Sequence, residues 1–196
     1  MVIGVTAEDG EPCVVMSSFL ATAAQGDRLS LEPYHLAAEM KRGPSDGVPA
    51  GAAAAVAEGR KRQCQLAAQG LGDIVRRLEE ARYEPVTAAL LVNRAGWITD
   101  LLAYSLSAPE HPAVAEGLAV REALRFALRR SGIQVAEMDE KSLQEAASKA
   151  LRKPSADIDS VLRAFRVTAG RPWRKEQQLA CLSAWVALAA LHARCG

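Results

Sequence analysis

Acidic side chains at the ends of apolar segments are the first candidates for chemistry. Glu8 and Asp9 follow the apolar run VIGVT by two and three positions, Glu137 lies within the alternating run IQVAEM, and Glu176 lies at the start of the last helical segment. Carboxylates suit Mg²⁺ because hard divalent cations prefer anionic oxygen ligands. Structural roles compete with catalysis, because Glu8 and Asp9 precede Gly10 in a turn sequence and a strand glutamate commonly forms a salt bridge.

Basic residues beside tryptophan form the second group of candidates, and they suit phosphate and base contacts. The chain as a whole has a net charge of +1, but residues 1–120 hold 10 basic and 15 acidic residues, and residues 121–196 hold 14 and 8. A basic segment, GRPWRKEQ, precedes the last helical segment, where positive charge opposes the helix dipole and so favours a functional role. Core or interface packing of Trp97 and a plain helix start at Pro172 are the structural alternatives. The candidate nucleic-acid contacts are Arg94, Trp97, Arg121, Arg171, Trp173, Arg174 and Lys175.

Other catalytic and cofactor sites lack their sequence patterns. The segment YSLSAPEHP contains Ser105, Ser107, Glu110 and His111, but no GxSxG element accompanies it and nothing in it predicts an oxyanion hole. Neither a phosphate-binding glycine loop nor a dinucleotide-binding pattern occurs. The four cysteines have no paired spacing, which indicates reduced thiols in a cytoplasmic protein and argues against a zinc site. We therefore expect no bound metal and no cofactor.

Hydrophobic periodicity predicts a mixture of strands and helices in a single domain spanning residues 1–196. A hairpin is expected first, then a third strand near 29–31 and a Gly/Pro/Ala-rich loop or insertion at about 43–55. The remaining strands are expected at 85–92 and 133–138, and the helices at about 53–82, 113–132, 140–151, 156–166 and 174–193. Strands that come first as a hairpin and then alternate with helices predict an α/β fold, with a mixed sheet covered by helices on both faces.

This order resembles the RNase H-like superfold, and within it the RuvC family of Holliday-junction resolvases. The resemblance is clearest over residues 66–141, where LAAQGLGDIVRRLEEARYEP is similar to the family helix that ends before the central strand, and VTAALLVN is similar to that strand. Arg121 then matches a family arginine and Glu137 the glutamate of the following strand. The segment WRKEQQLACLSAWVALAALHA is similar to the closing helix.

The resemblance implies a two-Mg²⁺ nuclease site built from four carboxylates, and this sequence departs from that pattern. Thr6 stands at the position of the first-strand acid, and the end of the central strand, residues 91–93, holds no acid. In the last helix Ser183 precedes Ala184 where the family motif ends in Asp-Ala. Neutral side chains cannot balance two divalent cations, so the resemblance predicts a catalytically degenerate member.

Three functions remain open from the sequence. The first is a non-catalytic protein that binds nucleic acid or a protein partner through its basic C-terminal part. The second is a divergent Mg²⁺-dependent, structure-specific endonuclease with relocated carboxylates among Glu8, Asp9, Glu137 and Glu176. The third is a structural homo-oligomer, such as a dimer, built on the apolar last helix. No apolar run reaches the ~18 residues that a membrane span needs, and the N-terminus lacks the basic region of a signal peptide.

Overall fold

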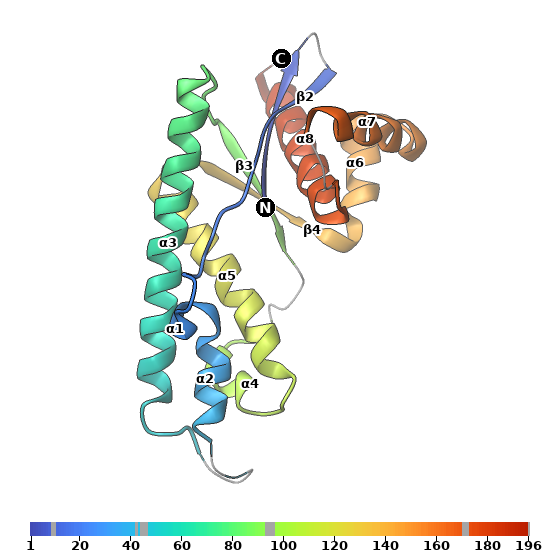
Figure 1. Ribbon diagram of the computed structural model, residues 1–196. Coiled ribbons are helices and arrows are strands. Elements are labelled where there is room, and N and C mark those ends of the chain that lie inside the picture. Colours follow the sequence, from blue (N-terminus) through green and yellow to red (C-terminus); the bar gives the residue numbers. More distant parts are fainter. Residues whose placement is uncertain (9–10, 42, 44–46, 93–96, 170–172, 196) are drawn as a thin grey trace. The chain divides into compact units, whose positions relative to one another are not determined.

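The computed structural model describes residues 1–8, 11–41, 43, 47–92, 97–169 and 173–195 (Figure 1). Its elements, in chain order, are β1 (Val2–Glu8), β2 (Glu11–Ser18), α1 (Arg28–Leu31), α2 (Pro33–Glu39), α3 (Ala52–Glu80), β3 (Thr87–Val92), α4 (Leu101–Ser105), α5 (His111–Arg130), β4 (Gln134–Asp139), a short 3₁₀ turn (Glu140–Ser142), α6 (Leu143–Leu151), α7 (Ser155–Thr168) and α8 (Lys175–Cys195). The mixture of strands and helices confirms the predicted α/β class.

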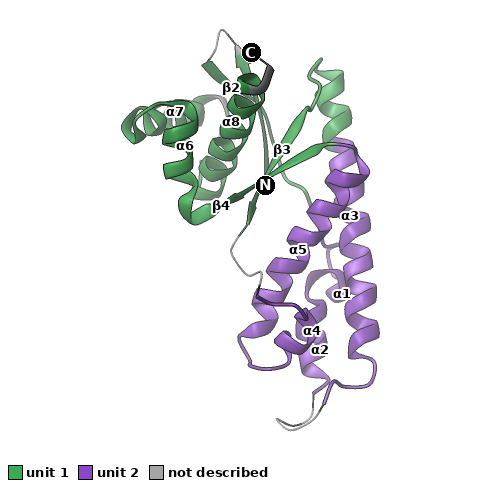
Figure 2. Ribbon diagram, turned by 180° about the vertical axis from the view of Figure 1, so that it is seen from behind, with its two compact units in different colours: residues 1–20, 74–94, 133–196 green, residues 21–73, 95–132 purple. Residues whose placement is uncertain are grey.

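The contacts within the chain divide it into two compact units (Figure 2). Unit 1 comprises residues 1–20, 74–94 and 133–196, and it holds all the described strands together with α6, α7 and α8. Unit 2 comprises residues 21–73 and 95–132, and it is helical. Each unit is therefore assembled from segments that are far apart in the sequence.

Within the described residues of unit 1, the strands hydrogen-bond in two separate pairs rather than in one mixed sheet. β1 and β2 form the predicted antiparallel hairpin, with an irregular register between Gly4 and Val5. β3 and β4 are parallel, with Leu90 opposite Glu137 and Val92 opposite Asp139. Only Leu90 of β3 is fully buried, whereas the unbroken apolar sequence of this strand predicts cover on both faces.

Helix α8 supplies much of the core of unit 1. Its sequence is apolar nearly all round, which predicted burial, and the helix contacts β1, β3, α6 and α7. Buried side chains from the hairpin, α6, α7 and α8 form one cluster: Ile3, Val14, Leu143, Ala147, Ile158, Leu162, Phe165, Cys181, Leu182, Trp185 and Val186. None of its residues from 177 to 187 is exposed, so this part of the helix is covered.

Small residues allow the helices of unit 2 to pack closely. Its core is formed by Tyr34, Ala37, Ala52, Val56, Ala115 and Ala119. Gly59 on α3 brings that helix against α1 and α2: a Cβ atom added there would meet the backbone oxygen of Leu29 and lie 2.5 Å from Cβ of Pro33. Gly72, further along α3, has no neighbouring atom within 4 Å of an added Cβ, so α3 makes no close approach at that position.

Three local predictions in unit 2 also differ from the structure. Residues 29–31 form part of helix α1 rather than a strand, and α2 follows directly with Pro33 in its first turn, a position that proline favours. Helix α4 was not predicted, although the side chain of Asp100 caps it by accepting a hydrogen bond from Ala103 N at 3.0 Å. The last four residues of the expected 43–55 loop, residues 52–55, belong to α3.

Candidate functional site

A stretch of unit 1 from residue 161 to residue 175 carries basic side chains and no acidic one. Arg171, one of its members, lies outside the described residues. The other four side chains are exposed, two on the C-terminal half of α7 and two at the start of α8: Arg163, Arg166, Arg174 and Lys175. In the described part of the chain none of these four has an acidic partner, and we call them the basic group.

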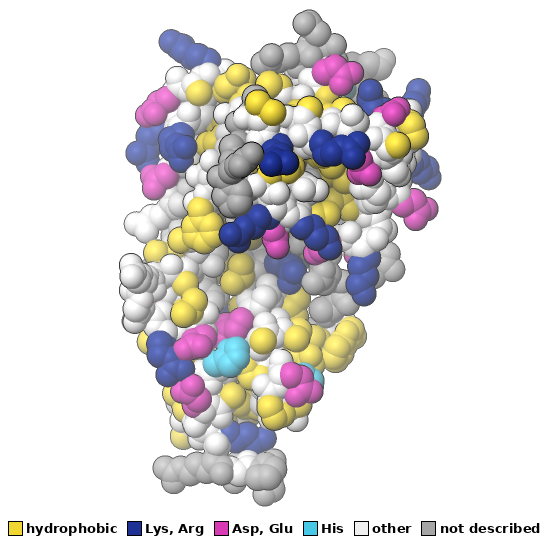
Figure 3. Space-filling model, turned by 45° about the vertical axis from the view of Figure 1, so that its right-hand side comes forward, with side chains coloured by type: hydrophobic (Ala, Val, Ile, Leu, Met, Phe, Trp, Pro, Cys, Tyr) yellow, Lys and Arg dark blue, Asp and Glu magenta, His cyan; other side chains and the backbone are white. Residues whose placement is uncertain are grey.

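Local structure fixes where the basic group lies. Arg163 and Arg166 are three residues apart, so they project from one side of α7, while Leu162 and Phe165 are buried on the other. At the start of α8, Oε1 of Gln177 accepts a hydrogen bond from the backbone N–H of Arg174 at 2.9 Å. Figure 3 shows several Lys and Arg side chains, with Asp and Glu side chains among them, in the upper part of the view.

Trp173 does not serve as an exposed partner of Arg174 and Lys175. It is half-buried and packs against the core cluster of unit 1, and its Nε1 atom is buried without a hydrogen-bond partner in the described residues. Trp173 therefore anchors the start of α8. The basic group was only partly predicted: Arg174 and Lys175 were found beside the tryptophan, whereas Arg163 and Arg166 were missed, although the absence of acids between residues 161 and 175 was visible in the sequence.

The candidate carboxylates do not gather into a metal site in the part of the chain that the structure describes. No group of three or more His, Cys, Asp or Glu side chains there is arranged to hold an ion. Glu137 is exposed on β4, and Glu176 is exposed in the first turn of α8, where an acid complements the helix dipole. The side chain of Glu8, like the whole of Asp9, lies outside the description.

Thr6, Leu91 and Ser183 stand where the resemblance to the RuvC family implies metal-binding acids, and their side chains are neutral. Thr6 lies opposite Cys13 in the hairpin, and Leu91 packs against the core cluster. Ser183 exposes only 2% of its surface, and its hydroxyl donates to the carbonyl oxygen of Ala180 at 2.9 Å. The residues present therefore do not fit a pair of Mg²⁺ ions at these positions, because hard cations need anionic oxygens.

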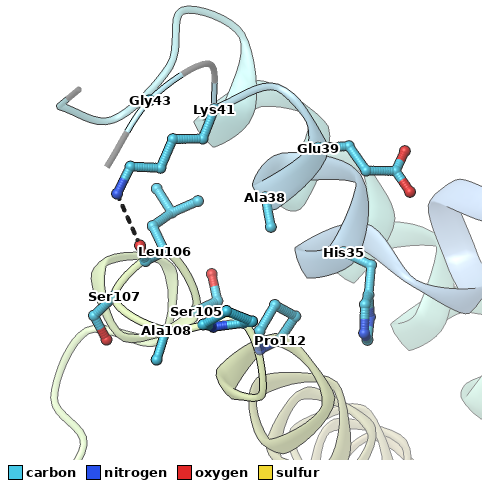
Figure 4. Close-up of a pocket in the computed structure, with 11 residues that line it drawn as sticks. His35, Ala38, Glu39, Lys41, Gly43, Ser105, Leu106, Ser107, Ala108 and Pro112 are labelled. Atoms are coloured by element: carbon cyan, nitrogen blue, oxygen red, sulfur yellow. Dashed lines mark hydrogen bonds between the residues drawn. The ribbon is translucent and has the colours of Figure 1, made fainter. Parts of the chain in front are cut away.

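Unit 2 contains a pocket of about 540 Å³ between α2 with its following segment and the α4–α5 connection (Figure 4). His35, Glu39 and Lys41 line one side, and Ser105 and Ser107 lie on the other. The charged groups already have partners: Nζ of Lys41 donates to the carbonyl oxygen of Leu106 at 3.0 Å, and Glu39 forms an ion pair with Arg28 at 2.8 Å. The pocket therefore offers few unused charges to a ligand.

The start of α2 is capped by a side chain from α5. Oε1 of Glu116 accepts hydrogen bonds from the backbone N–H groups of Tyr34 at 2.6 Å and His35 at 3.2 Å, and Nδ1 of His35 lies 3.7 Å from the same oxygen. Burial raises the pKa of the Glu116 carboxyl, and the two backbone hydrogen bonds oppose that rise. An acid near the start of a helix commonly complements the dipole of that helix. The structure gives Glu116 this role for another helix.

Glu116→Gln should change how stability depends on pH. Because the folded pKa of Glu116 is raised above its ordinary value of 4.5, the folded state keeps this proton at pH values where the unfolded state has lost it. The stabilisation that Glu116 gains from this difference in pKa is fully present at pH values below the unfolded pKa, and it is lost as pH rises through the folded pKa. The wild type should therefore gain stability relative to the variant as pH falls from neutral toward 4.5, in urea unfolding at several pH values. If the stability of the wild type relative to the variant stays constant or decreases on acidification, this prediction is contradicted. Glu122→Gln, at an exposed position on the same helix, is the control.

The serine and histidine side chains of the α4–α5 segment make a structural contact rather than a hydrolase site. Nδ1 of His111 lies 2.7 Å from Oγ of Ser107 and 3.0 Å from the carbonyl oxygen of Tyr104. A carbonyl only accepts, so Nδ1 must carry its proton to make that bond and cannot then take one from serine. Ser107 itself donates to the Tyr104 carbonyl at 2.7 Å, and Ser105 is buried. These contacts stabilise the turn.

Three aromatic rings lie in series in the same part of unit 2. Trp97 meets Tyr104 edge to face, with ring centroids 5.4 Å apart, and Tyr104 stacks on His111 at 4.0 Å. Trp97 is 71% exposed, so it does not pack into the core of its unit. Of the other candidates near it in the sequence, Arg94 lies outside the described residues, and Arg121 on α5 is half-buried and donates to the carbonyl oxygen of Gly117 at 3.2 Å.

Comparison of the chain with models of protein families, with curated proteins and with solved structures finds no match. Among the described residues, no helix combines the length and the apolar character needed to cross a membrane.

Proposed function

We propose that the protein is a non-catalytic, RNase H-like protein similar to the RuvC family, and that it binds nucleic acid through the basic group of unit 1. The observation that carries this proposal is the acid-free stretch 161–175, with four exposed basic side chains that have no acidic partner in the described residues. Exposed cations without internal partners are available to phosphates, whose binding releases condensed counterions.

The length of the connection between α7 and α8 is compatible with one continuous nucleic-acid contact. Lys175 follows Thr168 by seven positions in the chain, which limits the distance between the two helix ends to roughly 25 Å. Phosphates along one strand are spaced by a few ångströms, so a short oligonucleotide covers that distance. The arginines of α7 and the basic residues of α8 are therefore proposed to contact the same strand.

The proposal that catalysis is absent rests on the side chains at the family's metal positions. Ser183 is buried beside apolar residues, Thr6 and Leu91 carry no charge, and Glu137 stands on β4 without a described cluster around it. A divergent nuclease with relocated carboxylates makes a different prediction: cleavage of branched or single-stranded DNA in Mg²⁺ or Mn²⁺ that disappears in Glu137→Gln. We expect binding and no cleavage. Metal-dependent cleavage that Glu137→Gln abolishes would establish the alternative.

Arg174→Ala combined with Lys175→Ala should weaken DNA binding about tenfold at physiological salt, because two phosphate contacts are lost. The loss should be similar for different base sequences, since contacts to phosphates carry little sequence information. Fluorescence anisotropy with labelled oligonucleotides measures this effect. The matched control, Lys61→Ala with Arg130→Ala, removes the same charge from exposed positions of unit 2. Equal weakening by both double variants would show that net charge, and not the basic group, determines binding.

A further inference from the structure

Trp97 is an exposed aromatic side chain that is nevertheless held in place. It leaves 71% of its surface in solvent, although tryptophan has a large apolar area to bury. Its ring plane lies at 82° to that of Tyr104, and such an edge contact fixes the ring while covering little of it. Trp97 lies four residues before α4 and so belongs to the segment that leads into a helix.

Tyr104, which contacts Trp97, is itself held by further contacts. Tyr104 stacks on His111 with 11° between the ring planes, and His111 is held at Nδ1 by Ser107 and by the backbone of Tyr104. The indole thus stands at the outer end of a chain of contacts that reaches into α5. A ring ordered in this way loses little conformational freedom when a flat ligand stacks on it.

We infer that Trp97 stacks on an unpaired base, so that the nucleic acid bound by this protein is single-stranded or contains unpaired bases. The inference rests on the proposed function. Bases within a duplex are stacked on each other and are not available to a side chain, whereas unpaired bases stack readily on aromatic rings, largely irrespective of sequence. A protein-binding hot spot is usually surrounded by a ring of further contacts. The exposed residues that follow Trp97 most closely in the chain, Thr99 and Asp100, are polar.

The test compares Trp97→Leu with the wild type on a single-stranded oligonucleotide and on a duplex of the same length. We expect the variant to bind the single strand at least about fivefold more weakly, since stacking of one base contributes about that factor or more. Trp97→Phe should retain most of the affinity, and duplex affinity should not change. Because Trp185 is buried and Trp173 is half-buried, the single strand should also quench tryptophan fluorescence in the wild type much more than in Trp97→Phe.

The outcomes separate this inference from the proposed function. Unchanged single-strand affinity in Trp97→Leu, with salt-sensitive binding retained, overturns the stacking and leaves the basic group intact. Absence of any oligonucleotide binding by the wild type overturns both. A change in oligomeric mass by light scattering, with no change in single-strand affinity, would make Trp97 a protein contact and also overturns the inference. Phe19→Leu is the matched control, because Phe19 is an aromatic residue of unit 1 with 75% exposure.

Discussion

Ser183→Asp should lower the free energy of unfolding by about 3–5 kcal/mol at neutral pH, which is the range for a buried charge without a partner. The hydroxyl of Ser183 is buried in α8, and Cys181, Leu182 and Trp185 around it belong to the apolar core of unit 1. Among the described residues, no group of acids that could hold a metal ion surrounds this position. The variant tests whether the position of Ser183, where the resemblance to the RuvC family implies an acid, is part of the core.

The pH dependence and a metal titration make this test specific. Burial raises the folded pKa of the new carboxyl above its unfolded value, so the destabilisation should diminish as pH falls below the folded pKa. Ser183→Ala, which loses only the bond to the Ala180 carbonyl, should cost about 0.5–1.5 kcal/mol. Urea unfolding with and without Mg²⁺ or Mn²⁺ measures both effects. An aspartate variant as stable as the wild type, and stabilised further by either ion, would reveal a metal site and contradict the account.

Gly59→Ala should destabilise the protein by about 1–3 kcal/mol, even though alanine is the better helix former by about 1 kcal/mol. The added Cβ would meet the backbone oxygen of Leu29 and lie 2.5 Å from the Pro33 ring, and neither group can move without shifting α1 or α2 away from α3. Urea unfolding measures the loss of stability, and the dependence of the free energy of unfolding on urea concentration should stay unchanged. Wild-type stability in this variant would mean that α3 does not approach α1 and α2 so closely.

Gly72→Ala, in the same helix, is the matched control, and it should change stability in the opposite direction. No atom lies within 4 Å of a Cβ added there, and the residue is exposed. The substitution should therefore stabilise the protein by about 0.5–1 kcal/mol through helix propensity alone. A loss of stability in both variants would indicate a general intolerance of α3 rather than a local clash at Gly59.

Local patterns in the sequence were sufficient for the elements whose signals are local. The hairpin, α3, α5, α7 and α8 were predicted because their apolar periodicity and turn residues lie within a few positions of each other. Residues 29–31 were mistaken for a strand because three residues are too few to distinguish the hydrophobic period of a helix from that of a strand. Helix α2 was missed because the group that caps its start, Glu116, lies 82 positions away.

The pairing of β3 with β4 and the division into units could not be predicted, because they depend on contacts between distant segments. In the sequence, α4 and α5 lie between β3 and β4. No short segment of the sequence indicates the register that places Leu90 opposite Glu137. The basic group was predictable in part, since charge is visible in the sequence, but the burial of Trp173 depends on core packing. The series formed by Trp97, Tyr104 and His111 likewise needed the structure, because α4 was not expected.

The dependence of oligonucleotide affinity on salt tests the central claim most directly. If the basic group of unit 1 contacts phosphates, the logarithm of the association constant should fall linearly with the logarithm of salt concentration. Four described basic side chains predict a slope of about −3. The slope should become shallower by about 1.5 in the variant that lacks Arg174 and Lys175, since two of the four contacts are lost. A slope near zero, or an identical slope in that variant, would contradict the claim that these residues bind nucleic acid.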